Sequence, residues 1–243
     1  MLTWIDDHTA LPPARLALGA DSDAPGLVAA GGRVTPERLE EAYRHGIFPW
    51  YGPGQPVLWW SPDPRMVLPV AEFRLSHSLR KTLRRFRRSA GCELRFDCRF
   101  RRVIEACAQT PRRGQEGTWI VPSLLEAYVD WHEDGAVHSA ETWIDGELVG
   151  GLYFVAIGRM CFGESMFAHR TDASKIALAG LVAACRARGI PLIDCQQNTG
   201  HLASLGGREM RRERFEAHLA QTLDAPSPRE WSYDESAWDL LAL

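Results

Sequence analysis

Three polar side chains lie in or directly after apolar segments, where a polar group needs either a partner or a chemical role. Asp194 and Gln196 follow the apolar run 190–193, and Glu164 lies within the apolar stretch 161–167. Residues two apart in an extended chain share a face, so we expect Asp194 and Gln196 to point the same way. Ligands of α/β sheets gather at the carboxyl ends of strands. The three residues therefore predict a polar catalytic site there; the alternative is that each only bonds backbone at a sheet edge.

Other chemistries are disfavoured by incomplete motifs. The pentapeptide 163–167 begins like a G-x-S-x-G nucleophile elbow but ends in Phe. Neither Lys81 nor Lys175 follows a glycine, so there is no P-loop. The Q/R-x-x-G-x-G/A phosphate loop of acyl-CoA N-acyltransferases fails at its last position after both Arg186 and Gln197. No C-x-x-C and no H-x-x-x-H pair is present. We expect no metal and no cofactor.

Tryptophan is abundant, with nine residues in 243. Trp50 beside Pro49, and Trp119 after a Gly-Thr pair, suit the wall of a shaped pocket. An indole stacked on a base contributes about 1–3 kcal/mol, so these two are candidates for holding a nucleobase. The alternative is that they fill the core, which is the role we expect for Trp59 and Trp60.

Positive charge is concentrated in one segment. Between Arg74 and Arg102 there are eleven Lys and Arg against two acids, although the whole chain has a net charge of −3. Such a concentration is typical of a surface that contacts phosphates. No acid lies on the predicted helix 76–88 to pair with its cations. The alternative is a solvated face bridged to acids elsewhere in the fold.

The spacing of apolar residues predicts the elements that position these groups. Residues 1–33 are expected to form loops with a short strand. A helix is capped by Thr35, begins with Pro36 and is stopped by Gly46. Residues 47–64 predict an ordered, aromatic-rich loop, and we place a domain boundary near Pro64.

Beyond this boundary the pattern alternates between helices and strands, which predicts an α/β (α+β) fold around a mixed sheet. The Asp145-Gly146 pair predicts a tight type I′ hairpin turn. The expected helices cover 76–88, 99–109, 122–133, 173–188 and 208–222. The expected strands cover 138–144, 147–156, 159–166 and 190–193.

Composition limits where the chain can act. The longest apolar run, 176–185, is too short to span a bilayer, and the N-terminus lacks the pattern of a signal peptide. Six cysteines without a secretion signal favour reduced thiols. We expect a cytoplasmic protein that does not enter membranes, and a monomer.

Five motifs, in order along residues 26–223, resemble those of the bacterial leucyl/phenylalanyl-tRNA–protein transferases. They are Gly46-Ile47-Phe48-Pro49-Trp50, Trp59-Trp60-Ser61-Pro62-Asp63-Pro64-Arg65, Glu116-Gly117-Thr118-Trp119-Ile120, Gly163-Glu164-Ser165-Met166-Phe167 and Leu192-Ile193-Asp194-Cys195-Gln196. The resemblance implies an enzyme that moves Leu or Phe, with Met as a further candidate, from aminoacyl-tRNA to a protein with N-terminal Arg or Lys. The product is marked for degradation by the N-degron pathway. The implied architecture is a small N-terminal domain (1–64) and an acetyltransferase-like (GNAT-like) domain (65–243).

The same resemblance implies roles for individual residues. Trp50 and Trp119 match the pair that holds the terminal adenosine of the tRNA. Glu164, Asp194 and Gln196 match the polar catalytic positions. The positions that line the pocket for the amino-acid side chain are Leu152, Cys161 and Ile193. The basic cluster for the tRNA acceptor stem is Arg80, Lys81, Arg84 and Arg85.

Two departures bear on the side-chain pocket, because the position of Leu152 is commonly Met in the family and that of Cys161 commonly Phe. Two other functions remain open from the residues alone. One is an acetyl-CoA-dependent N-acetyltransferase, which the broken phosphate loop disfavours. The other is a non-catalytic RNA-binding module, which would leave Asp194 and Gln196 without a role.

Overall fold

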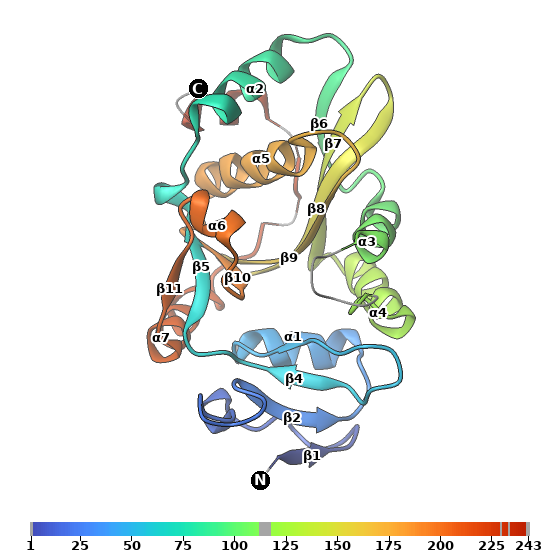
Figure 1. Ribbon diagram of the computed structural model, residues 1–243, viewed down its shortest axis with the longest axis vertical. Coiled ribbons are helices and arrows are strands. Elements are labelled where there is room, and N and C mark those ends of the chain that lie inside the picture. Colours follow the sequence, from blue (N-terminus) through green and yellow to red (C-terminus); the bar gives the residue numbers. More distant parts are fainter. Residues whose placement is uncertain (1, 112–117, 229, 233, 242–243) are drawn as a thin grey trace.

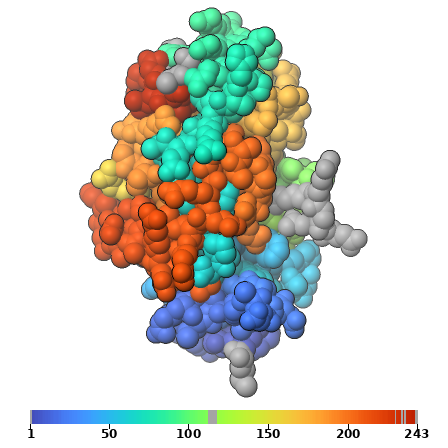
Figure 2. Space-filling model, turned by 60° about the vertical axis from the view of Figure 1, so that its left-hand side comes forward, coloured from blue at the N-terminus to red at the C-terminus, as the bar shows by residue number. Residues whose placement is uncertain are grey.

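The computed structural model of the chain describes residues 2–111, 118–228, 230–232 and 234–241. Two sheets of different size lie one below the other in Figure 1, and helix α2 (His77–Arg88) and the N-terminal strands occupy opposite ends of the molecule. Figure 2 shows the same arrangement from the side, with the blue N-terminal residues at one end of the surface.

The small sheet is built from residues before Pro64 and has the order β1-β2-β4-β3. Its strands are β1 (Thr3–Ile5), β2 (Leu27–Gly31), β3 (Phe48–Pro49) and β4 (Leu58–Trp60). Two of these strands lie in the segment 47–64, which we expected to be a loop. The strands form there because Trp59 is fully buried and its Nε1 donates to the Gly31 carbonyl at 3.0 Å, which fixes β4 against β2.

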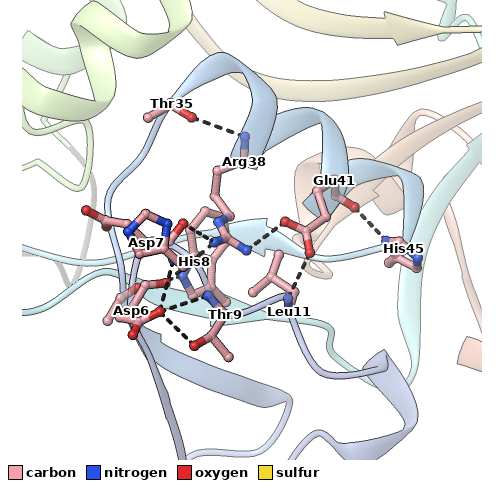
Figure 3. A network of polar contacts seen from close by, with 11 residues as sticks. Asp6, Asp7, His8, Thr9, Leu11, Thr35, Arg38, Glu41 and His45 are labelled. Carbon is pink, nitrogen blue, oxygen red and sulfur yellow. Dashed lines mark hydrogen bonds and ion pairs between the residues drawn. The ribbon is translucent and has the colours of Figure 1, made fainter.

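Helix α1 (Pro36–Arg44) covers this sheet and is capped as the sequence predicted. The Thr35 side chain accepts a hydrogen bond from the backbone N–H of Arg38 at 3.2 Å, and Gly46 adopts φ +69° after the helix ends. Figure 3 shows how Arg38 and Glu41 of this helix hold the N-terminal segment. Arg38 donates to Glu41 at 2.6 Å and to the Asp7 carbonyl at 3.1 Å, and Glu41 accepts from the Leu11 N–H at 2.8 Å.

The large sheet has seven strands in the order β11-β5-β10-β9-β8-β7-β6. They are β5 (Arg65–Pro69), β6 (Cys92–Phe96), β7 (Val137–Ile144), β8 (Glu147–Ile157), β9 (Met160–Ala168), β10 (Leu192–Gln196) and β11 (Arg208–Met210). Only β10 and β9 pair in parallel, and the other neighbours are antiparallel. The expected mixed α/β fold is therefore confirmed. Asp145 and Gly146 both have positive φ between β7 and β8, as a type I′ turn requires.

Helices cover both faces of the large sheet (Figure 1), with α5 on one face and α3 and α4 on the other. The helices are α2 (His77–Arg88), α3 (Phe100–Gln109), α4 (Pro122–Glu133), α5 (Ala173–Ala187), α6 (Gly200–Ser204) and α7 (Arg212–Thr222), with 3-10 turns η1 (Ala14–Leu16), η2 (Val70–Glu72) and η3 (Glu235–Leu241). The expected helix 208–222 is wrong at its start. Residues 208–210 pair with β5 as strand β11, because tertiary pairing overrides local preference there.

The core follows from the alternation of side chains along the strands. On β8, Tyr153 and Val155 join the apolar cluster beneath α3 and α4, whereas Leu152 and Phe154 join the cluster beneath α5. The first cluster also contains Leu39 from the N-terminal part of the chain. The small sheet and one face of the large sheet thus pack against this first cluster. The expected division at Pro64 falls in the link between β4 and β5.

Candidate active site

A cavity of about 280 Å³ opens where β9 and β10 meet the N-terminal part of the chain. It brings together residues that are far apart in sequence, from strand β3 to helix α6. Its lining comprises Phe48, Trp50, Trp119, Leu152, Tyr153, Gly163, Glu164, Ser165, Met166, Leu178, Leu181, Ile193, Cys195, Gln196, Gln197, Thr199, His201 and Leu202. Most of these side chains are apolar, and a few polar groups converge among them, as in a typical small-molecule site.

Both tryptophans proposed for a nucleobase line this cavity. Trp50 is half-buried and Trp119 is 8% exposed. Trp60 packs against Trp50. The two rings lie edge to face with 5.7 Å between their centres, and the Trp60 Nε1 donates to the Trp50 carbonyl at 2.7 Å. Trp59 fills the core, as expected. Glu116 and Gly117 of the motif that contains Trp119 lie outside the described residues.

Asp194 does not line the cavity. Its carboxylate accepts two hydrogen bonds from Arg65, from Nε at 2.8 Å and from Nη2 at 2.6 Å, and the two side chains are 0% and 1% exposed. Arg65 also donates to the Gly46 carbonyl at 2.9 Å, and its guanidinium lies within 4.8 Å of the ring centres of Phe48 and Phe215. The ion pair links β10 to β5. The other contacts of Arg65 link this pair to α7, through Phe215, and to the turn after α1, through Gly46.

Gln196 lines the cavity, so the expectation that it points the same way as Asp194 is wrong. The register of β10 shifts between these two residues, and Gln196 adopts φ +61°. A bulge of this kind breaks the alternation of side chains along a strand and turns one of them in a new direction. Asp194 contacts the backbone of Gln196, whose N–H donates to Oδ1 at 2.9 Å. The Gln196 side chain instead donates from Nε2 to Glu164 Oε1 at 2.9 Å.

Glu164 is the carboxylate that faces the cavity. Its Oε2 accepts a hydrogen bond from the Tyr128 hydroxyl at 3.2 Å, and the Tyr43 hydroxyl lies 2.6 Å from that of Tyr128. Burial raises the pKa of Glu164 to about 7, against the opposing effect of hydrogen bonds from Tyr43, Gln196 and Tyr128. The negative charge of Asp194 adds to the increase. At neutral pH this group therefore exists in both protonation states.

The sequence reasoning missed three residues of this polar network: Arg65, Tyr43 and Tyr128. Arg65 ends a motif that we recognised only as a resemblance. Both tyrosines occupy the buried faces of helices that the sequence predicted correctly. A signal was available, because a buried tyrosine hydroxyl normally finds a hydrogen-bond partner.

The apolar part of the cavity agrees only partly with the expected side-chain pocket. Leu152 and Ile193 line it, together with Leu178 and Leu181 of α5, which the sequence reasoning did not single out. Cys161 does not reach the cavity. It is fully buried against Cys185, with a distance of 3.8 Å between the sulfur atoms, and burial raises the pKa of its thiol.

The cations of α2 form a surface apart from the cavity, at the end of the molecule opposite to the N-terminal strands (Figure 1). Leu79, Leu83 and Phe86 bury the other face of the helix. Arg80 is half-buried and the remaining three residues of the predicted cluster, Lys81, Arg84 and Arg85, are exposed. These three make no ion pair with any residue that the structure describes. Arg87 does bridge to an acid elsewhere in the fold, Asp239, at 2.7 Å.

Among the described residues, no group of three or more His, Cys, Asp or Glu side chains could hold a metal ion. Within the same residues, no helix is both long and apolar enough to cross a membrane.

The fold and the cavity define an α/β protein with an aromatic and apolar binding site next to a carboxylate–amide pair. The model of the leucyl/phenylalanyl-tRNA protein transferase family matches residues 67–220, and the model of that family's N-terminal domain matches residues 32–63. The chain belongs to this family. As the sequence motifs predicted, it is an enzyme of the aminoacyltransferase class.

The curated relatives agree. A leucyl/phenylalanyl-tRNA–protein transferase of Methylibium petroleiphilum is 64% identical, with 100% of this chain and 92% of the relative covered. One of Leptothrix cholodnii is 61% identical, with 98% and 94% covered. Similar solved structures include L-PGS from Bacillus licheniformis (TM-score 0.38, 14% identity, 71% of this chain and 54% of that chain covered). They also include a GCN5-related N-acetyltransferase from Kribbella flavida (TM-score 0.31, 12% identity, 71% and 60% covered).

Proposed function

We propose that the protein transfers Leu or Phe from aminoacyl-tRNA to the α-amine of a protein whose first residue is Arg or Lys, and that it does so as a cytoplasmic monomer. The observation that carries the proposal is one cavity with a tryptophan pair, an apolar wall and the Glu164–Gln196 pair. These three features correspond to the three parts of the reacting end of the donor: the terminal adenine, the amino-acid side chain and the ester.

The tryptophan pair supports adenine binding, because indole faces stack on any base. Trp50 is held by Trp60, which reduces the entropy lost when a base stacks on it. Leu152, Ile193 and the α5 leucines support binding of an apolar side chain such as Leu or Phe. Cys161 does not line the cavity, so it packs within the apolar cluster beneath α5 and does not contact the bound side chain.

The Glu164–Gln196 pair supports the chemical step. Because Gln196 donates through Nε2 to Glu164, its side-chain oxygen is left to accept a hydrogen bond from an attacking amine. Asp194 acts as a positioning residue, since it fixes the backbone N–H of Gln196 and is itself held by Arg65. In its ionised state Glu164 also attracts a cationic acceptor.

The ester of an aminoacyl-tRNA is already activated, so forming the amide needs no nucleotide hydrolysis. The α-amine has an ordinary pKa of about 7.7–8.0, so a useful fraction is uncharged near neutral pH. Most of the rate acceleration should come from holding ester and amine together, for which effective molarities can reach about 10⁵ M or more.

The exposed face of α2 is proposed to hold the acceptor stem through Arg80, Lys81, Arg84 and Arg85. Three of these cations lack a described ion-pair partner, so phosphates can contact them without displacing an acid. Contacts to phosphates release counterions and make binding fall with salt concentration.

The test is a transfer assay with purified protein, leucyl-tRNA labelled in its leucine and a short peptide that begins with Arg. We expect the label to move to the peptide. Two matched controls are the same peptide with an acetylated N-terminus, which lacks the nucleophile, and a peptide that begins with Glu. If the label remains on the tRNA in every case, the proposal is refuted and an RNA-binding module is the remaining function. If acetyl-CoA binds in a calorimetric titration, the result favours an acetyltransferase instead.

A further inference from the structure

Two buried tyrosines and one amide form a continuous hydrogen-bonded chain that ends on Glu164. Tyr43 and Tyr128 are both 0% exposed and come from different helices, α1 and α4. Gln196 Nε2 donates to one oxygen of Glu164 and the Tyr128 hydroxyl to the other, at 2.9 Å and 3.2 Å. With the Tyr128 proton on Glu164, the oxygen of Tyr128 is free to accept a hydrogen bond from the Tyr43 hydroxyl, which lies 2.6 Å away and also lowers the pKa of Glu164.

The direction of this chain favours a carboxylate, because both oxygens of Glu164 accept from neighbouring donors. Around Glu164, α1 supplies Tyr43, α4 supplies Tyr128, and β10 supplies Gln196 and the charge of Asp194. The cation Arg65 pairs with Asp194. The tyrosine chain is thus the means by which the fold counteracts burial of this acid.

Asp194 is poorly suited to accept a proton. Its two oxygens already accept three hydrogen bonds, two from Arg65 and one from the Gln196 N–H, and the side chain is fully buried. A proton on Asp194 would have to displace the guanidinium. Glu164 lines the cavity, and its pKa of about 7 matches the pH at which a general base works best.

Resting on the proposed transfer activity, we propose that Glu164 accepts the proton that the acceptor amine loses, and that Tyr128, held by Tyr43, is a positioning residue that keeps Glu164 ionised and oriented. In the step, the amine nitrogen forms a C–N bond with the ester carbonyl carbon. The C–O bond to the ribose oxygen breaks. The amine proton passes to Glu164 and then to the leaving ribose oxygen, which becomes a hydroxyl and restores the carboxylate.

The experiment measures single-turnover transfer from saturating leucyl-tRNA to an Arg-ended peptide as a function of pH. Below about pH 7 wild type should lose rate more steeply than protonation of the acceptor amine alone predicts, because Glu164 is protonated as well. Tyr128→Phe removes a donor to the carboxylate, so this limb should move to higher pH by about one unit, with near-normal rates above it. Glu164→Gln should lower the rate about 100-fold or more at every pH and leave only the limb of the acceptor amine, whose pKa of about 7.7–8.0 is common to all variants.

Tyr51→Phe is the matched control, because Tyr51 is a buried tyrosine whose hydroxyl lies 3.3 Å from Ser123 Oγ and forms no described hydrogen bond with Glu164. Its pH profile should equal that of wild type. Tyr43→Phe provides a second variant that should move the limb in the same direction as Tyr128→Phe, because Tyr43 also lowers the pKa of Glu164. Binding of leucyl-tRNA and the unfolding transition show that each variant is folded.

Two results would overturn the inference: wild-type rates in Glu164→Gln, or a pH profile of folded Tyr128→Phe that coincides with that of Tyr51→Phe. In both cases wild type would still transfer leucine, so the proposed function would stand. If wild type itself transfers nothing, the proposed function fails instead.

Discussion

The buried ion pair between Arg65 and Asp194 provides a sharp test of how the site is held together. Asp194→Ala would leave the Arg65 guanidinium 1% exposed and without its acid, between the rings of Phe48 and Phe215. Breaking a buried pair by removing one partner costs about 3–5 kcal/mol. The missing acceptor for the Gln196 N–H adds about 1 kcal/mol. The free energy of unfolding should therefore fall by roughly 4–6 kcal/mol, a large part of the 5–15 kcal/mol typical of a domain.

The assay is unfolding in urea, followed by fluorescence of the nine tryptophans. Arg65→Met should cost a similar amount, because it leaves a buried carboxylate. The double variant Arg65→Met/Asp194→Leu replaces both charges by apolar side chains, and such replacements are often close to neutral. We expect its stability to lie well above the sum of the two single losses, with a coupling free energy of about 3 kcal/mol.

The reasoning would be refuted if Asp194→Ala lost less than about 1 kcal/mol, since that is the level of an exposed ion pair. Additive losses in the double variant would refute it as well. Transfer by the double variant then separates two roles of Asp194. Restored stability with low transfer and normal leucyl-tRNA affinity is the result expected of a residue that positions Gln196.

Three further predictions concern other parts of the molecule. Arg84→Glu combined with Arg85→Glu should weaken tRNA binding and reduce the slope of log K against log salt by about one for each phosphate that the variant no longer binds, as measured by filter binding. Glu164 has a pKa of about 7 in the fold against an ordinary 4.5, so the folded state binds more protons and wild-type stability should fall as pH rises from about 5 to 7. Glu164→Gln should remove this fall and raise the melting temperature at pH 8. Gly158→Ala should lower the free energy of unfolding in urea by more than about 1 kcal/mol, because Gly158 has φ +60° and an added Cβ would collide with the Thr222 and Leu223 carbonyls.

Two of these predictions have a matched control variant within the chain. Arg33→Glu changes an exposed cation shortly after β2, whose sheet lies at the end of the molecule opposite to α2, and should leave the salt slope unchanged. Gly200→Ala places a Cβ in open space within helix α6 and should be neutral or slightly stabilising. An unchanged salt slope in the α2 variant would contradict the assignment of the basic surface. Equal melting-temperature profiles for wild type and Glu164→Gln would contradict the raised pKa, and equal losses for the two glycine variants would contradict the steric argument.

Local patterns determined much of the secondary structure. The predicted helix 122–133 coincides with α4, and Thr35, Pro36 and Gly46 delimit α1 as expected. These predictions were correct for one physical reason. Apolar periodicity, helix caps and turn residues act over a few neighbouring positions, so one short segment of sequence is enough to predict the helix or turn that it forms. The strands β3, β4, β5, β6 and β11 were missed because they are short and exist only through pairing with other strands of the sheets.

The sequence by itself determined the family, the apolar faces of the helices and the residues Trp50, Trp119, Glu164 and Gln196 as members of a site. The tertiary structure alone decided their partners. Arg65 and Asp194 are 129 residues apart and meet because β5 and β10 pair. That pairing engages Asp194 away from the cavity, the shift in register turns Gln196 into it, and Glu164 is left as the acid within it. The spacing of residues in the sequence could not predict these partners, because they depend on which buried groups the folded chain brings within hydrogen-bonding distance.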